Sequence, residues 1–306
     1  MPELPEVQTT VDGINSRVRG LVISDAWTDY GGASHADKDD IRSTLFFKTF
    51  RASVGGATVN EARRRGKNIL IELSNGMIVL VHMKMTGHMM HGRYDTKTWK
   101  PSDPRDPALN DPFNRFIHFA LTFTDGTSLV LSDMRKFAKV TLLDRVTAHQ
   151  SKHLRDHGPE PLDASFTVNR LVEALSRKPN GAIKTVLMDN TVVSGIGNIY
   201  SDEILWRTGI HPLERVRDIP LGAWTKILSA IKELLQKGID FGGDSMSDYR
   251  NITGERGSFQ GQHRAYRKTG SICEKKGCAG TITRLKVGGR SAHFCPVHQK
   301  LLKGHS

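Results

Sequence analysis

The 306-residue chain has few cysteines and no long hydrophobic run. It contains three cysteines. An odd number suits a metal site completed by a histidine better than it suits a disulfide framework. No apolar stretch reaches the roughly 18 residues that a membrane-spanning helix needs. The start of the chain also lacks the basic-then-apolar pattern of a secretory signal peptide, so a cytoplasmic protein is expected.

Acidic residues are scarce relative to basic ones. The sequence has 44 lysines and arginines against 32 aspartates and glutamates, which gives a formal net charge of +12 and a pI of about 9.7. This surplus favours a polyanionic partner, either nucleic acid or an anionic membrane surface. No basic amphipathic helix supports the membrane alternative, so nucleic acid is the favoured partner.

The first half of the chain has the pattern of a β-rich domain behind one helix. Apolar residues recur every three or four positions from Val7 to Val18, which predicts a helix that Gly20 ends. Strand-like runs flank Asn75-Gly76 and Asp125-Gly126, which are turn pairs typical of β-hairpins. These patterns predict a β-sandwich or flattened barrel with a leading helix, and loops over 31–45 and 91–115.

The second half has helical spacing. It predicts helices over 166–177, 182–188, 199–208 and 221–237, followed by a loop rich in glycine and serine. Residues 266–306 contain nine lysines and arginines and one glutamate, so the end of the chain is strongly basic. The predicted fold class is α+β, with enough length for two domains and a small terminal module.

The opening sequence Met-Pro-Glu-Leu-Pro-Glu-Val contains a candidate nucleophile. If Met1 is removed, Pro2 carries a terminal secondary amine, and an α-amino group titrates near pH ~8, so much of it is unprotonated. Such an amine can attack a sugar C1′ and form an iminium ion, with Glu3 beside it to move protons. The plainer alternative is that Pro2 starts a loop and that Glu3 and Glu6 charge a helix N-terminus.

The three cysteines and one histidine have metal-ligand spacing. Cys273-x4-Cys278-x16-Cys295-x2-His298 offers a tetrahedral Cys₃His set, typical of a structural zinc ion because four protein ligands leave no open position for water. His293 is a second possible fourth ligand. Three unligated thiols beside an incidental histidine are the alternative.

The opening MPELPEV resembles the start of the formamidopyrimidine-DNA glycosylase family, relatives of bacterial endonuclease VIII. Further stretches resemble the family in the same order along the chain: RRGK at 64–67, HMKMTG at 82–87, DMRKF at 133–137, GPEPL at 158–162, GIGNIY at 195–200, GGDSMSDY at 242–249, GSFQ at 257–260 and GRSAHF at 289–294. The resemblance implies a catalytic β-sandwich domain over 1–147, a helix–two-turn–helix DNA-binding domain over 148–264 and a zinc β-hairpin over 265–306.

The resemblance also implies an activity, that of a bifunctional DNA glycosylase and AP lyase in base excision repair. Pro2 would attack C1′ of an everted oxidised purine nucleotide in duplex DNA, Glu3 would move protons, and β- and δ-elimination would follow. Lys67 would lie by the phosphate beside the damaged nucleotide, and Arg290 would grip the flanking phosphates. These four residues form the expected catalytic set.

Three further residues match those that fill the DNA where the base has left. Met85 would enter the duplex, Phe137 would wedge beside it, and Arg135 would read the orphaned partner base. An apolar wedge restores part of the stacking that base flipping removes, and an arginine fork suits the acceptors of cytosine. Lys84 stands where the family usually has glycine.

The helical half and the following loop supply the remaining candidates. By the resemblance, Asn198 bonds a phosphate, and Lys184 is a DNA-binding lysine near the active site. Glu160 matches the GPEPL carboxylate in the cleft between the family's domains. The 242–260 loop would close over the everted base, and the candidates for base recognition are Glu6, Ser245 and Tyr249.

The sequence departs from the family pattern at the terminal hairpin and leaves alternatives open. The family standard is C-x2-C-x16-C-x2-C, whereas this chain has x4 in the first knuckle and His298 in place of the last cysteine. The MPEL start favours the oxidised-guanine branch over the endonuclease VIII branch, which acts on oxidised pyrimidines. A non-catalytic DNA-binding protein is the other alternative, against which Pro2, Glu3 and Lys67 count. A monomer with one structural zinc ion is expected.

Overall fold

The computed structural model describes residues 1–31, 37–246 and 248–301. The chain forms two compact units, Met1–Arg155 with Phe241–Ser258, and Asp156–Asp240 with Phe259–Ser306. Residues 241–258 therefore group with the first unit, whereas the sequence placed them in the helical domain; the three expected domain bounds themselves stay a prediction. None of the helices in the described ranges is both long and apolar enough to cross a membrane.

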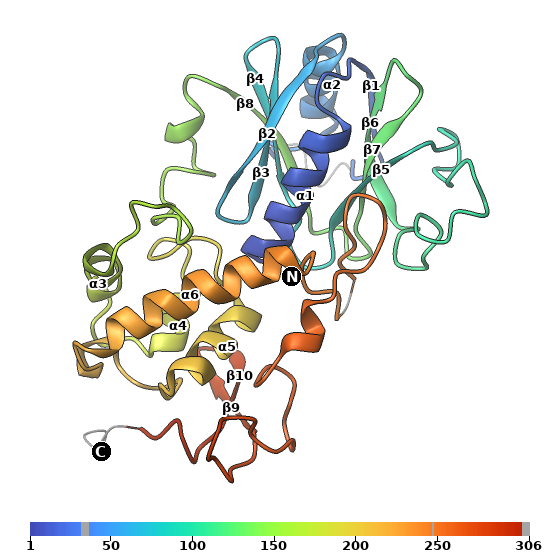
Figure 1. Ribbon diagram of the computed structural model, residues 1–306. Coiled ribbons are helices and arrows are strands. Elements are labelled where there is room, and N and C mark those ends of the chain that lie inside the picture. The colour runs from blue at the N-terminus through green and yellow to red at the C-terminus, as the bar shows by residue number, and fades with distance from the viewer. Residues whose placement is uncertain (32–36, 247, 302–306) are drawn as a thin grey trace. The chain divides into compact units, whose positions relative to one another are not determined.

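Helix α1 (Leu4–Arg17) begins the first unit. Its apolar face is buried, and Gly20 follows its end with a positive φ of 85°, so the predicted helix and its glycine stop are confirmed. The helix packs against strands of both sheets of the unit (Figure 1). The first turn of α1 is consequently kept in place by packing against the core of the unit, although it lies next to the chain end.

Two four-stranded antiparallel sheets form the predicted β-sandwich (Figure 1). One sheet has the order β1 (Ile23–Thr28), β6 (Ile117–Phe123), β7 (Ser128–Ser132), β5 (His88–Gly92), and the other has the order β2 (Val59–Arg65), β3 (Asn68–Leu73), β4 (Met77–His82), β8 (Lys139–Asp144). The hairpins at Asn75-Gly76 and Asp125-Gly126 are confirmed, and both glycines have positive φ, as such turns require. On β3, alternate residues from Ile69 to Leu73 enter the core between the sheets.

Helix α2 (Thr44–Val54) was not predicted, and its first residues lie in the expected 31–45 loop. Ser43 caps it by accepting a hydrogen bond from the Phe46 N–H at 3.3 Å. Phe50 and Val54, four residues apart, face the core of the sandwich. Helical spacing of apolar residues behind a serine cap was the signal that could have found it. Residues 32–36 of the expected loop lie outside the described residues.

The 91–115 segment beyond β5 is irregular as predicted, but it is not simply exposed. Tyr94 and Trp99 are buried in a small apolar cluster against the sheet, and the Trp99 ring lies 4.8 Å from the Trp27 ring. Aromatic residues on a loop gain stability by covering the apolar outer face of a sheet. Polar and proline content alone therefore underestimated the packing of this loop.

The second unit is helical, as predicted. Its helices are α3 (Val168–Ser176), α4 (Ile183–Leu187), α5 (Asn198–Thr208) and α6 (Ala223–Asp240), and the β-hairpin is β9 (Thr283–Val287) with β10 (Arg290–Phe294). Short 3₁₀ turns occur at η3 (Val216–Asp218) and η4 (Phe259–Gln262), and η2 (Ala148–Gln150) lies in the first unit. Gly238 lets α5 and α6 approach closely, because a Cβ there would lie 2.2 Å from the Tyr200 hydroxyl.

Candidate active site and metal centre

The first turn of α1 is locked by two reciprocal hydrogen bonds. The Glu3 N–H donates to Glu6 Oε2 at 2.7 Å, and the Glu3 carboxylate accepts from the Glu6 N–H. Pro2, Glu3 and Glu6 are all buried. A capping box of this kind fixes the direction in which the chain enters the helix. It therefore fixes residue 2, which immediately precedes the cap.

The Glu6 carboxylate also anchors the loop that follows Phe241. Glu6 Oε1 accepts the Asp244 N–H at 2.8 Å, and the backbone carbonyl of Glu6 accepts the Tyr249 hydroxyl at 3.1 Å. Gly243 passes so close that a Cβ would lie 3.0 Å from Glu6 Cγ, and its φ of 87° favours glycine as well. Burial raises the pKa of Glu6 to about 7, with the charge of Glu3 as the second cause.

The structure brings the three candidates for base recognition together but uses their polar groups internally. The Ser245 hydroxyl donates to the Tyr249 carbonyl at 2.8 Å and accepts the Gly257 N–H at 2.8 Å. The Tyr249 hydroxyl is engaged by Glu6, as described above. These side chains shape the loop from within, and their contact with a base stays a prediction. Ser247, in the middle of the loop, lies outside the described residues.

Lys67 lies in the turn between β2 and β3, after Gly66 with a φ of 57°. Arg64 ties this turn to α1, because its Nε donates to Gln8 Oε1 at 3.0 Å and its Nη1 donates to the Gly66 carbonyl at 3.1 Å. Lys67 is largely buried. The turn that carries this lysine is thus fastened to the helix that begins beside Pro2.

One buried carboxylate holds the two turns that carry Met85, Arg135 and Phe137. Asp133 accepts hydrogen bonds from the Ala138 N–H at 2.7 Å, the Tyr30 hydroxyl at 3.0 Å, the Arg135 N–H at 3.3 Å and the Thr86 hydroxyl. Thr86, which donates through its hydroxyl, belongs to the β4–β5 turn, and the two backbone donors, Arg135 and Ala138, belong to the β7–β8 turn. The sequence match included Asp133 but gave it no role.

The side chains presented by these turns are accessible. Phe137 is 48% exposed, and the Arg135 guanidinium lies over its ring at 4.4 Å from the centroid. Met85 is half-buried, whereas Met83 is part of the core. An exposed aromatic ring stacked with a cation on a rigid turn is suited to insertion between bases.

The backbone conformation of Lys84 explains why a glycine suits this position. Its φ is 56°, in the left-handed region, and its backbone N–H donates to His82 Nδ1 at 3.0 Å. Lys136 in the second turn has a φ of 52°, so two of the four non-glycine residues with positive φ in the described chain lie in these two turns. Burial lowers the pKa of Lys84, and the charges of Lys139 and Arg42 lower it further. Backbone strain of this kind is typical of functional turns.

Lys184 does not lie at the surface of the second unit. It is fully buried, and its Nζ donates to Asp202 Oδ1 at 2.5 Å and to the Ser201 hydroxyl at 3.1 Å. The other oxygen of Asp202 accepts the backbone N–H and the Nδ1 of His293 at 3.0 and 2.8 Å. This carboxylate joins α4, α5 and β10, and Lys184 is buried at that junction; its role in DNA binding stays a prediction.

Glu203, the next residue on α5, anchors the segment that leads into the terminal hairpin. Its carboxylate accepts the backbone N–H groups of Arg264, Ala265 and Tyr266 at 2.8 to 3.0 Å. Burial raises its pKa, although these hydrogen bonds act in the opposite direction. Neither Asp202 nor Glu203 received a role from the sequence; two acidic residues inside an apolar helix were the available signal.

The remaining candidates of the second unit lie on turns. Asn198 is the first residue of α5, and its Oδ1 is buried without a hydrogen-bond partner among the described residues. Glu160 lies within 3.5 Å of the Ser194 hydroxyl, in a segment packed on residues 189–195. Arg290 is exposed at the start of β10, beside Gly288-Gly289 at the tip of the hairpin.

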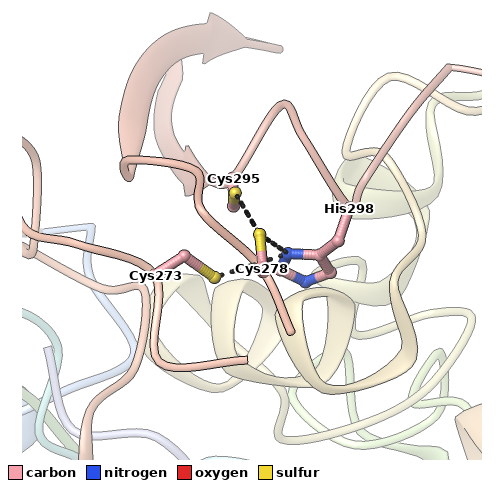
Figure 2. A group of neighbouring side chains, drawn as sticks. All are labelled: Cys273, Cys278, Cys295 and His298. Carbon is pink, nitrogen blue, oxygen red and sulfur yellow. Dashed lines mark hydrogen bonds between the residues drawn. The ribbon is translucent and has the colours of Figure 1, made fainter. Parts of the chain in front are cut away.

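The four predicted metal ligands converge on one point. Among the described residues, the Sγ atoms of the three cysteines and one nitrogen of His298 all lie within 4.8 Å of one another (Figure 2). The Cys278 and Cys295 sulfurs are 3.6 Å apart, and His298 Nδ1 is 3.4 Å from Cys273 Sγ. Ligands about 2.3 Å from a tetrahedral zinc ion stand about 3.8 Å apart, so the spacing fits such an ion.

The surroundings of this cluster orient its ligands. His298 Nε2 lies 3.1 Å from the Trp206 carbonyl, to which it can donate, and this leaves the Nδ1 lone pair facing the sulfurs. The Trp206 indole N–H donates to Cys273 Sγ at 3.3 Å. His293 is engaged by Asp202 instead, so the geometry selects His298 as the fourth member of the cluster.

Comparison with known proteins agrees with this arrangement. The model of the formamidopyrimidine-DNA glycosylase N-terminal domain matches residues 1–140, and the model of the H2TH domain of the same family matches residues 157–250. A formamidopyrimidine-DNA glycosylase of Jannaschia sp. is 35% identical over 98% of this chain and 100% of its own length. One of Enterococcus faecalis is 32% identical over 98% of both chains.

Solved structures of the Lactococcus lactis Fpg protein are similar over almost the whole chain. Its complex with DNA that contains an abasic site has a TM-score of 0.81 and 29% identity, and covers 97% of this chain and 99% of that one. Its complex with DNA that contains an oxidised pyrimidine has a TM-score of 0.80 at 29% identity, and covers 98% and 100%. The chain belongs to the formamidopyrimidine-DNA glycosylase family.

We expect Asp133→Ala to lower the free energy of unfolding by about 3 to 5 kcal/mol, because several buried donors would lose their acceptor at once. Tyr30→Phe, which removes only one of these donors, should cost about 1 kcal/mol. Urea denaturation measures both, and amide hydrogen exchange should show faster exchange in 84–87 and 133–138. A cost no larger than that of Tyr30→Phe would show that Asp133 does not hold the two turns.

We expect the buried Glu6 carboxylate to make stability fall as pH rises. The folded state keeps its proton up to about pH 7, whereas the ordinary value is 4.5, so the folded state binds more protons over that window. Relative to Glu6→Gln, the native chain should lose about 3 kcal/mol of unfolding free energy across it. Urea denaturation at several pH values tests this, with the exposed Glu173→Gln as control. Parallel pH profiles for the native chain and Glu6→Gln would contradict it.

Proposed function

We propose that this chain is a bifunctional DNA glycosylase and AP lyase that removes oxidised purines, 8-oxoguanine and formamidopyrimidines, from duplex DNA in base excision repair. The observation that carries the proposal is the locked first turn, in which the Glu3–Glu6 hydrogen bonds hold residue 2 in place. A terminal nucleophile needs such support, because chain ends are otherwise poorly ordered. The family relation supports the same activity.

The chemistry begins at Pro2 once Met1 has been removed. Its secondary amine attacks C1′ of the everted nucleotide, the bond from C1′ to the base breaks, and an iminium ion forms. Glu3, one residue away, gives a proton to the sugar or the leaving base and takes one back during elimination. β- and δ-elimination then release the sugar and leave a one-nucleoside gap with phosphate ends.

The remaining residues bind and shape the DNA. Lys67 and Arg290 bind the phosphates beside the lesion, and Asn198, at the start of α5, donates to another phosphate through its amide. Met85 and Phe137 fill the space that the base leaves, and Arg135 reads the orphaned base. Lys184 supports the Asn198 turn through Ser201 and Asp202 and acts without touching DNA.

Recognition of the base depends on the shape of the 242–249 loop. Because Ser245 and Tyr249 direct their hydroxyls into the loop, its backbone amides and carbonyls are the groups that meet the base. Glu6 fixes the loop from α1 through the Asp244 N–H. The loop is therefore coupled to the same helix turn that supports Pro2.

The terminal hairpin holds one structural zinc ion. Cys273, Cys278, Cys295 and His298 supply four ligands with tetrahedral spacing, which leaves no position for a reactive water. The ion ties the two ends of the hairpin module together, and Arg290 projects from the tip of β9–β10. Zinc thus contributes to DNA binding by stabilising the hairpin, not to the chemistry at C1′.

We expect sodium borohydride to trap a covalent complex on a duplex that carries one 8-oxoguanine opposite cytosine. Pro2→Gly should reduce the trapped fraction about a hundredfold, because a primary amine in a more flexible terminus replaces the secondary amine. Mass spectrometry of the N-terminus establishes that Met1 has been removed, and Asn60→Ala on the exposed side of β2 serves as control.

Other outcomes of this experiment would reassign the chain. Trapping on a thymine-glycol duplex alone would indicate the endonuclease VIII-type specificity. Tight binding without trapping on either duplex, with Met1 shown to be absent, would leave a non-catalytic binder of damaged DNA. The complex of the Lactococcus lactis relative with an oxidised pyrimidine makes the thymine-glycol duplex a necessary second substrate.

We expect His298→Ala to lower the zinc content from about one ion per chain to almost none, whereas His298→Cys retains it, because a cysteine restores four ligands. Atomic absorption measures the metal, and duplex affinity should fall together with it. His293→Gln is the matched control, since that histidine contacts Asp202. Zinc lost in His293→Gln but kept in His298→Ala would contradict the assignment.

A further inference from the structure

The outer face of the β2-β3-β4-β8 sheet carries a pocket of about 610 Å³. Its described lining residues come from β2, β3, β4 and the segment 145–155, so the pocket lies wholly within the first unit. It is formed where this segment crosses the sheet face that points away from the sandwich core. None of the residues proposed above to act in catalysis or to contact DNA lines it.

The floor of the pocket is apolar. Leu70 and Ile78, from neighbouring strands, meet Ala148 and Leu154 from the crossing segment. These residues form a small hydrophobic cluster that is separate from the main core. Leu70 is only half-buried, so the cluster still exposes apolar surface inside a concave site. A ligand with a hydrophobic side chain would complete this packing.

The rim of the pocket is rich in arginine. Five of its eleven described lining residues are arginines, namely Arg63, Arg64, Arg65, Arg145 and Arg155, and the described lining contains no lysine. Glu72 is the one acidic residue in this lining. Arg63 is already paired with acidic neighbours, because its Nε donates to Glu61 Oε1 at 2.9 Å and lies 3.5 Å from Glu72 Oε1. A planar guanidinium binds carboxylates through two parallel hydrogen bonds, so the rim strongly favours an anion.

The combination of floor and rim distinguishes between anions. A duplex presents a convex backbone whose polar phosphates cannot cover the apolar floor. An acidic peptide offers carboxylates and hydrophobic side chains on one chain, and so matches both parts. We propose that this pocket docks an acidic peptide segment of a partner protein, with carboxylates on the arginine rim and an aliphatic or aromatic side chain on the floor.

This inference goes beyond the repair activity and does not depend on it. Arg64 is left out of the test, because it also fastens the Lys67 turn. Arg145 is the suitable position, since its side chain is exposed. Its hydrogen bond to the Gly76 carbonyl at the strand end comes from its backbone N–H, so a change of side chain leaves that bond in place. Arg19→Glu, an equal change of charge at an exposed position after α1, is the matched control.

Fluorescence polarisation with a labelled short peptide of alternating aspartate and leucine tests the proposal on the full chain. We expect Arg145→Glu to weaken peptide binding about tenfold, while Arg19→Glu changes it by less than about twofold. Replacing the leucines of the peptide by serine should weaken binding to the native chain about tenfold as well. Thermal unfolding of both variants shows that the fold is kept.

A second measurement separates the peptide from DNA. Arg145→Glu should leave the affinity for a duplex with an abasic site within about twofold of the Arg19→Glu value, because a pocket outside the DNA surface contributes only through net charge. Equal loss of peptide binding in the two variants would overturn the proposal. So would unchanged affinity for the serine peptide, or a duplex affinity that falls selectively in Arg145→Glu, since the pocket would then be part of the DNA surface.

Discussion

The Glu6 carboxylate sets the geometry at the beginning of the chain. It accepts the Glu3 N–H and the Asp244 N–H, and so fixes both the residue that precedes α1 and the loop that returns to it from far along the sequence. A nucleophile at a chain end has one covalent attachment instead of two. The hydrogen bonds of the capping box replace the missing constraint, and burial in the core of the first unit keeps water from competing for them.

Buried carboxylates that accept several hydrogen bonds also fix other turns and segments of the chain. Asp133 accepts donors from two turns, Asp202 joins a lysine of α4 to a histidine of β10, and Glu203 accepts three consecutive backbone N–H groups. A carboxylate has about four acceptor positions, more than any neutral side chain, so one residue can satisfy several backbone donors that secondary structure leaves unpaired. The cost is desolvation, which raises the pKa of Glu6 and Glu203 although the backbone donors offset part of it.

Short sequence patterns predicted the features that depend on neighbouring residues, such as turns and the spacing of cysteines. Asn75-Gly76 and Asp125-Gly126 marked both hairpins, and the spacing of the cysteines and His298 identified the four side chains that converge in a cluster able to hold a metal ion. The misses depend on contacts distant in sequence. The 94–99 aromatics pack on the sheet although their loop is polar, the burial of Lys184 depends on Asp202 on another helix, and nothing local assigns residues 241–258 to the first unit. Lys84 was visible as a departure, but its left-handed backbone was not.

Residues 241–258 belong to the first unit although most of the second unit precedes them in the sequence, and this has a consequence for how the protein is made. A ribosome delivers the chain from the N-terminus, and domains generally fold as they emerge. The first unit cannot finish at Arg155, because the Asp244 N–H and the Tyr249 hydroxyl that complete the surroundings of Glu6 are synthesised only after the helices of the second unit. During that interval the first turn of α1 lacks part of its surroundings. The hydrogen bonds to Glu6 that hold this turn are therefore complete only after the 242–249 loop has been translated.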